Sequence, residues 1–402
     1  MASLSVTGFR SALKQVFSKA KVERLSLTEH PLFAQLKKVD DLYGSSMKVP
    51  MILSNPAGIS STFTNAQANK ASGRYKDWDI SRAKAYGLLS VDYEALVASE
   101  RDVGAFLKAK TAELEGIMIG LTDDLERSLF GTGSGSVGRV SASTTLSGAV
   151  IVLTNPEDAL NFSLDRVIKF SSANGGGSLR AGSLKVTAVD GNAGTVTVDA
   201  NINSGITSPA ANDYIFFDGD YDAKIKGLAA WIPDTAPTSG DNFNSVDRSV
   251  DPIRLAGHRI DGVGRQVEEV INEAVMTTSR YGAKLTHLWV SYSEMTNIQN
   301  SLGAKVQRTD MKVGEVLFEG IEINGPKGKI KIFASPYCPA NRMYGLDMST
   351  WELHTMKQVP HLQDLDGNDQ LREATADAVE IRTCYFCQLV CLNPGKNCVI
   401  LR

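Results

Sequence analysis

The chain has no long apolar run, little cysteine and a nearly balanced charge. No stretch approaches the ~18 apolar residues of a membrane-spanning helix, and the N-terminus has no hydrophobic signal core, so we expect synthesis and folding in the cytoplasm. A formal net charge of -3 argues against a protein that mainly neutralises nucleic-acid phosphates. The five cysteines are an odd number and gather near the C-terminus, which is unlike a secreted disulfide framework, so free thiols are expected.

Motifs of enzymes and cofactor-binding proteins are also scarce. The five histidines show no HExxH spacing, and no G-x-S-x-G occurs. Gly133 to Gly138 formally matches G-x-G-x-x-G, but a dinucleotide site needs a strand before the glycines and a helix after them. Here a predicted helix precedes them and a Ser/Thr-rich stretch follows, so the sequence predicts a flexible connector. We expect no catalytic and no cofactor-binding residues.

Two segments resemble metal sites without meeting their requirements. Cys384 and Cys387 have the C-x-x-C spacing of zinc ligands, but strand alternation turns them to opposite faces, so buried thiols are expected instead. The acidic segment from Asp364 to Asp369 has its glycine at the fourth position, whereas a calcium loop of the EF-hand type needs it at the sixth. We therefore expect a solvated turn there and no metal site.

The composition is typical of a globular protein, and one segment of the chain is unusual. Its 402 residues are 43% hydrophobic and 22% charged, enough for two or three domains with cores of their own. The unusual segment runs from Asn55 to Arg74 and is polar and rich in small residues. Apolar residues 47–53 precede it, and from Trp78 to Tyr86 alternate residues share one face of an extended strand.

This pattern predicts a long hairpin over residues 47–90 with its tip near Ala66. About 20 residues at ~3.3 Å each reach roughly 60 Å, whereas a body of about 300 residues has a radius of gyration near ~19 Å. Because an isolated hairpin is marginally stable, it needs a neighbouring surface, and a second copy of the chain would supply one. The alternative is a disordered surface loop. The residues predicted to contact a neighbouring subunit are Phe63, Asn65, Gln67, Lys70, Arg74, Tyr75 and Trp78.

The segment before the hairpin, residues 1–46, is predicted to be an arm that packs on another subunit. Phe9, Leu13 and Phe17 recur at helical spacing beside basic residues, and these three are the predicted contacts. The alternative for the first ten residues is a frayed terminus.

The strongest helical pattern follows the hairpin, from Glu100 to Phe130. Apolar residues recur at a period of about 3.6, Ser99 is placed to cap the N-terminus, and Gly131 ends the run. Between residues 148 and 219 the pattern changes to short β-branched runs separated by turn residues, which predicts an inserted small β-barrel or sandwich of five or six strands.

The remainder alternates between helix and strand and then becomes antiparallel. A helix from Gly264 to Arg280, a strand from His287 to Val290 and a helix opened by the capping box Ser291-x-x-Glu294 predict a mixed α/β domain. The last strands, ending with a long one that starts at Ala378, are expected to form an antiparallel sheet against the long helix.

This order of elements resembles the major capsid proteins of tailed bacteriophages, which have the Hong Kong 97 type of shell fold. The local matches are Asn55-Pro-Ala-Gly-Ile-Ser, Asn65-Ala-Gln-Ala-Asn69, Gly227-Leu-Ala-Ala-Trp-Ile-Pro233, Ile323-Asn-Gly-Pro-Lys-Gly328, and Glu373-Ala-Thr-Ala-Asp-Ala-Val-Glu-Ile-Arg382 with Tyr385 and Gln388. The resemblance implies an α+β fold with an N-terminal arm, an extended hairpin loop, a spine helix, an axial α/β domain and an inserted small β-barrel. The expected parts are the arm (1–46), the hairpin loop (47–90), the peripheral domain with the spine helix (91–138), the β-rich insertion (139–226), the axial domain (227–340), and the peripheral sheet with the C-terminus (341–402).

The resemblance also implies a function. The chain would be a non-enzymatic structural protein of the virion, assembled in the host cytoplasm from hexamers and pentamers into an icosahedral shell around double-stranded DNA. Scaffold, portal or decoration proteins are possible partners, contact with DNA would be non-specific, and no membrane partner is expected. Some members form Lys to Asn cross-links, for which Lys70 or Lys76 with Asn393 or Asn397 would be the counterparts. The alternative is a non-capsid phage structural or adhesion protein that binds through the β-rich insertion, and a third hypothesis is a soluble enzyme.

Overall fold

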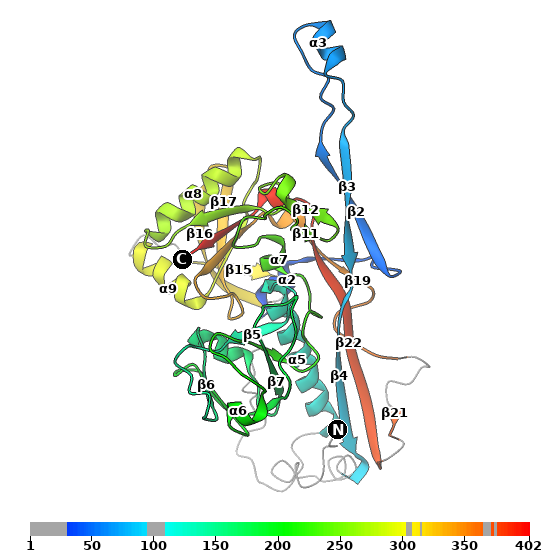
Figure 1. Ribbon diagram of the computed structural model, residues 1–402, viewed down its shortest axis with the longest axis vertical. Coiled ribbons are helices and arrows are strands. Elements are labelled where there is room, and N and C mark those ends of the chain that lie inside the picture. Colours follow the sequence, from blue (N-terminus) through cyan, green and yellow to red (C-terminus); the bar gives the residue numbers. More distant parts are fainter. Residues whose placement is uncertain (1–29, 95–108, 303–307, 314–315, 365–370, 374–375) are drawn as a thin grey trace.

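The computed structural model describes residues 30–94, 109–302, 308–313, 316–364, 371–373 and 376–402. The predicted arm contacts Phe9, Leu13 and Phe17 lie outside these residues, as does the first part of the predicted long helix. The molecule is elongated, because two strands project from one end well beyond the body formed by the remaining sheets and helices (Figure 1).

The projecting strands are the predicted hairpin. Strand β2 (Ser46–Ser54) pairs antiparallel with β3 (Arg74–Ser81), and a short helix, α3 (Phe63–Ala68), lies at the tip. The hairpin ends at Ser81, because the next strand, β4 (Ala83–Asp92), pairs with a strand near the C-terminus instead of with β2. The predicted range 47–90 is therefore corrected to 46–81.

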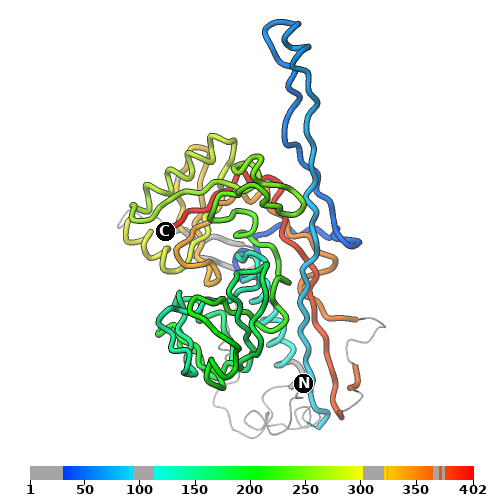
Figure 2. The backbone as a smooth tube through the Cα atoms, in the orientation of Figure 1, coloured from blue at the N-terminus to red at the C-terminus, as the bar shows by residue number. Residues whose placement is uncertain are grey.

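The sheet that continues from the hairpin is built from both ends of the chain. Strand β4 pairs along its whole length with β22 (Ala378–Cys391), and Figure 2 shows the two chain segments running side by side. The other strands of this sheet are β1 (Lys37–Asp40), β19 (Trp351–Thr355), β20 (His361–Leu362) and β21 (Leu371–Arg372).

The long helix α5 (Ala109–Phe130) lies along this sheet and contacts both β4 and β22. The contact with β22 confirms the prediction that the last long strand packs against this helix. Gly87 of β4 permits this close packing. A Cβ at that position would lie 2.6 Å from Oγ1 of Thr383 and 2.8 Å from Cγ1 of Ile117 on the helix. Only a residue without a side chain therefore fits between the strand and the helix.

A second sheet has seven strands and forms the core of the predicted mixed α/β domain. Helices α8 (Val267–Arg280) and α9 (Tyr292–Leu302) pack on one face of it, and the backbone N–H of Glu294 donates to the Ser291 hydroxyl (3.3 Å), as the capping box predicts. The strands in order are β13 (His258–Asp261), β23 (Cys398–Leu401), β18 (Arg342–Leu346), β14 (His287–Val290), β17 (Gly328–Ala334), β16 (Val316–Gly325) and β15 (Arg308–Val313).

Two of these strands were expected elsewhere. Strands β18 and β23 fall in residues 341–402, which the sequence assigned to the peripheral sheet. In the structure β23 pairs parallel with β13 and antiparallel with β18, so the C-terminal strand belongs to the seven-stranded sheet. The predicted boundary at residue 340 is corrected accordingly.

The β-rich insertion is a closed six-stranded sheet. An antiparallel bridge between Val140 and Leu153 joins its first and last strands, which makes it a small barrel. The strands in order are β5 (Ser136–Arg139), β10 (Tyr214–Phe217), β7 (Val167–Ser171), β8 (Leu184–Asp190), β9 (Thr195–Val198) and β6 (Val150–Val152). Strand β5 lies in the segment predicted to be a flexible connector, so that prediction was wrong. Gly135 has φ of 84°, and a Cβ there would clash with the Asp220 carbonyl, which explains why a glycine stands at this position.

Short elements complete the fold. These are α2 (Pro31–Gln35), η1 (Pro156–Asn161), α6 (Ile202–Gly205), α7 (Leu228–Trp231), β11 (Asn242–Phe243), β12 (Val246–Asp247), η2 (Arg248–Val250), η4 (Met348–Thr350) and η5 (Pro394–Lys396). No helix in the described part of the chain has the length and apolar character needed to cross a bilayer.

The five cysteines are free and buried, as expected from the sequence. Burial raises the pKa of Cys391 and of Cys398 to about 12, so both are neutral thiols in the core. Among the described residues no group of three His, Cys, Asp or Glu side chains is arranged to hold a metal ion. The calcium-like segment lies mostly outside the described residues.

Candidate assembly interface

The base of the hairpin is fixed by an aromatic cluster within the same chain. The Trp78 side chain is only 1% exposed, and its ring lies edge-on to Trp231 at 5.2 Å and to Phe243 at 6.0 Å between centroids. Trp231 in turn donates from Nε1 to the Leu389 carbonyl of β22 (3.1 Å). Trp78 is therefore a core residue, and its predicted role as a contact to a neighbouring subunit is corrected.

Backbone hydrogen bonds reinforce this anchor. The Asp79 N–H of β3 donates to the Asn244 carbonyl (3.0 Å), which ties the strand to the β11–β12 turn. The Gln388 side chain of β22 donates to the Ser81 carbonyl (2.9 Å) and accepts from the Lys226 N–H (2.9 Å). These contacts fix the direction in which the hairpin leaves the body.

Beyond the anchor, the distal hairpin is exposed. Ile59 is 87% exposed, Phe63 82% and Tyr75 70%, and α3 has no buried residue. The other predicted contacts in the distal hairpin, Asn65, Gln67, Lys70 and Arg74, are exposed as well. Ile59 was missed because no strand or helix pattern singles it out, although its apolar side chain in a polar segment was a usable signal. Large apolar side chains that are this exposed are the kind of feature found at interaction surfaces.

The distal hairpin also carries charge of one sign. Lys70, Arg74 and Lys76 are exposed, and no carboxylate occurs between residues 55 and 76. The surface that receives this segment is therefore expected to offer apolar groups together with carboxylates or backbone oxygens.

A buried charge network joins the spine helix to the barrel and the peripheral sheet. Asp124 of α5 contacts Arg127 (2.5 Å) and Lys224 (2.6 Å), and it accepts from the Tyr385 hydroxyl of β22 (2.9 Å). Burial by itself would raise the pKa of Asp124, but the two cations and the hydrogen bonds lower it to about 2. No sequence signal identified this network, because its members lie far apart along the chain.

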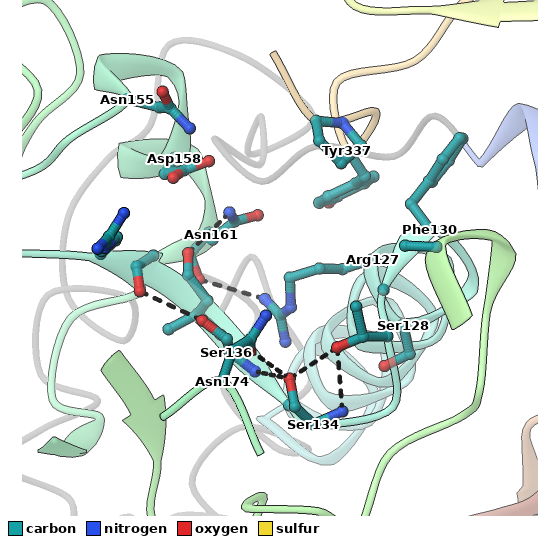
Figure 3. A pocket seen from close by; sticks show the side chains of 18 of the residues that line it. Arg127, Ser128, Phe130, Ser134, Ser136, Asn155, Asp158, Asn161, Asn174 and Tyr337 are labelled. Carbon is teal, nitrogen blue, oxygen red and sulfur yellow. Dashed lines mark hydrogen bonds between the residues drawn. The ribbon is translucent and has the colours of Figure 1, made fainter. Parts of the chain in front are cut away.

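A polar cavity lies at the same junction. It measures about 330 Å³ and lies between the end of α5, the glycine-rich segment, η1 and the loop that carries Tyr337 (Figure 3). Arg127 donates across it to the Asn161 carbonyl (3.2 Å), and Ser134 donates to Asn174 (2.7 Å). Burial raises the pKa of Asp158 at its wall to about 7. The contact from Arg127 joins α5 to η1 of the β-rich insertion, so the cavity lies where the barrel packs on the long helix.

One of the proposed cross-link acceptors is buried. Asn397 has no exposed surface, and its Oδ1 accepts from the Asp347 N–H (2.8 Å) and from Nε1 of Trp351 (3.0 Å). A lysine of another subunit therefore cannot reach it without disrupting the core. Asn393 is exposed.

Comparisons with known proteins give a match to one family model over part of the chain and matches to solved structures over nearly all of it. Residues 214–376, less than half of the chain, match the family model described as SU10 major capsid protein. The Cyanophage A-1(L) capsid asymmetric unit aligns with a TM-score of 0.57 at 13% identity, covering 95% of this chain and 95% of that one. A chain of the capsid of a native GTA particle aligns with a TM-score of 0.52 at 8% identity, covering 100% and 99%. A search of curated protein sequences gives no match. The two structural likenesses establish the fold, which is the Hong Kong 97 type predicted from the order of elements.

Proposed function

We propose that this chain, a major capsid protein with the Hong Kong 97 type of fold, assembles by laying the distal hairpin of each copy on the surface of a neighbouring copy. As a capsid protein it is a structural component of the virion, and its main partners are other copies of itself.

The observation that carries the proposal is the exposed apolar surface of a hairpin whose direction is fixed. Ile59, Phe63 and Tyr75 lie beyond the anchor at Trp78, and within the described part of the chain all three side chains are largely exposed. Burying a large apolar side chain stabilises a complex by roughly 1.5–3 kcal/mol. A few such contacts per copy, repeated around a closed shell, give a stable assembly through multivalency.

The finer features of the function are proposed from the resemblance in fold. We propose an icosahedral shell built from hexamers and pentamers, with the seven-stranded domain around the capsomer axes and double-stranded DNA inside. Scaffold, portal or decoration proteins are proposed partners, and no enzymatic activity is proposed. The barrel is held to the spine helix through Asp124 and Lys224, which favours a structural role for it over that of a free adhesion module.

Two hairpin variants test the proposal. In the first, residues 55–73 are replaced by an Asn-Gly turn joining Ser54 to Arg74, which already lie opposite each other in the ladder. In the second, the same residues are replaced by a Gly/Ser linker of equal length. None of residues 55–73 is buried, so both subunits should fold with unchanged far-UV circular dichroism.

Negative-stain microscopy and size-exclusion chromatography then report assembly. We expect shells from the wild type and none from either variant, because both lack the distal side chains. Normal shells from the linker variant alone would mean that only the length of the hairpin matters. Normal shells from both variants would refute the proposal.

A further inference from the structure

The exposed side of helix α8 carries charge of opposite sign at its two ends. Along this side Glu269, Glu273, Met276 and Arg280 follow one another at intervals of three or four residues, and all four are exposed. The helix has 14 residues, which at ~1.5 Å per residue span roughly 20 Å. The acidic and the basic end of α8 are therefore two separate surfaces of the subunit.

At the acidic end carboxylates outnumber cations. Glu269 and Glu273 share the guanidinium of Arg265, at 2.8 Å and 2.6 Å, and their side chains remain 64% and 46% exposed. Asp261 and Glu268 add two further carboxylates, which accept hydrogen bonds from a backbone N–H and from a hydroxyl group. Four carboxylates thus surround one guanidinium, and this end of the helix keeps an excess of negative charge.

At the basic end three exposed cations come together from three segments. Arg280 ends α8, Lys284 lies in the loop to β14, and Lys327 lies in the turn between β16 and β17. Nζ of Lys327 donates to the Ser279 carbonyl (3.1 Å), and a Cβ on Gly328 would lie 3.5 Å from Cε of Lys284. No carboxylate among the described residues pairs with any of the three cations.

The helix dipole explains only part of this arrangement. Acidic residues in the first turn of a helix and basic residues in the last turn stabilise it, which accounts for Glu269 and Arg280. The effect falls off within the terminal turns, so it does not account for Glu273 in the middle of the helix or for Lys284 beyond its end. It also gives no reason for the exposure of Met276, which is 60% exposed beside these charges.

Opposite charges at opposite ends of α8 suit a contact between successive copies in a ring. A contact that joins two different patches of identical subunits is heterologous, and it forms a ring when the rotation between copies closes. The acidic end of one copy attracts the basic end of the next, whereas like ends repel each other. The same charges therefore favour one orientation of each copy over the reverse.

We propose that the acidic end of α8 in one copy contacts the basic end of α8 in the next copy of the same capsomer, with Lys284 and Lys327 taking part. This inference rests on the proposed function, because it names the contact that closes the rings of a shell protein. It is separate from the hairpin contact, because none of these residues belongs to residues 46–81.

Charge reversal at one end or at both ends tests the contact. The acidic-end variant is Glu269→Lys with Glu273→Lys, and the basic-end variant is Arg280→Glu with Lys284→Glu. We expect each to raise the subunit concentration needed for assembly at least about tenfold in light scattering and negative-stain microscopy, because like charges then meet. The variant with all four changes again joins opposite charges, so it should assemble at a lower concentration than either of the other two.

The four-change variant also separates this contact from the helix dipole. If the charges acted only through the dipole, reversing both ends would add two unfavourable changes, and this variant would assemble worst. The control is Lys185→Glu with Lys357→Glu, two exposed cations on the barrel and in the loop after β19. It changes the net charge as much as the basic-end variant does, and it should assemble like the wild type.

The outcomes distinguish this contact from the proposed function. The contact is overturned if either single-end variant assembles like the wild type, if the four-change variant assembles no better than both, or if the control is impaired as much as they are. In each of these cases wild-type shells would leave the proposed function standing. A wild-type chain that forms neither shells nor rings would refute both.

Discussion

Replacing Trp78 by alanine separates a core role from an interface role for this residue. The side chain is fully buried against two aromatic rings, and removing a buried tryptophan costs about 3–5 kcal/mol. Each edge-on aromatic pair accounts for roughly 0.5–1.5 kcal/mol of this loss. We therefore expect Trp78→Ala to destabilise the unassembled subunit by about 3–5 kcal/mol, whereas Trp78→Phe, which keeps one ring in the cluster, should cost less.

Urea denaturation of the unassembled subunit, followed by far-UV circular dichroism, measures this loss. The matched control is Tyr75→Ala, three residues away on the same strand but 70% exposed, which should leave the free energy of unfolding within about 0.5 kcal/mol of the wild type. Tyr75→Ala should instead weaken assembly. A Trp78→Ala subunit of wild-type stability that fails only to assemble would refute the core assignment.

Two further predictions concern the spine helix α5. Gly87→Ala places a Cβ within 2.8 Å of both Thr383 and Ile117, so it should destabilise the subunit by about 1–3 kcal/mol in urea denaturation. Gly120→Ala, on the same helix with open space around it, should stabilise by up to about 1 kcal/mol, and equal effects of the two changes would contradict the packing argument. Burial raises the pKa of Glu126 from 4.5 to about 8, although two backbone N–H groups of α2 oppose this shift. The pKa of Glu126 is higher in the folded than in the unfolded subunit, so its contribution to the free energy of unfolding is complete below about pH 4.5. This contribution is lost as the pH rises through about 8, and the loss is on the order of 3–5 kcal/mol. The urea midpoint of the wild type should fall between pH 5.5 and pH 9 and that of Glu126→Gln should not, so a flat wild-type profile would count against the assignment.

The elements that could be predicted from the amino-acid sequence are those whose residue pattern repeats within a few positions. The alternation before and after the polar segment predicted the hairpin strands, and the 3.6-residue period predicted α5 and α8. Short β-branched runs between turn residues predicted five of the six barrel strands. The buried, unpaired state of the cysteines also followed from alternation and composition. These features are encoded locally, because in a helix or a strand the spacing between two nearby residues determines whether their side chains share a face.

The tertiary structure alone decided which distant segments meet. It placed Trp78 against Trp231 in the core instead of on the interface, and it moved the C-terminal strand beside His258–Asp261. It also brought Asp41 to His354, more than 300 residues further along the chain. Strand pairing, burial and buried ion pairs depend on how the whole chain packs, and a pattern that spans a few residues carries no information on which partner a face will meet.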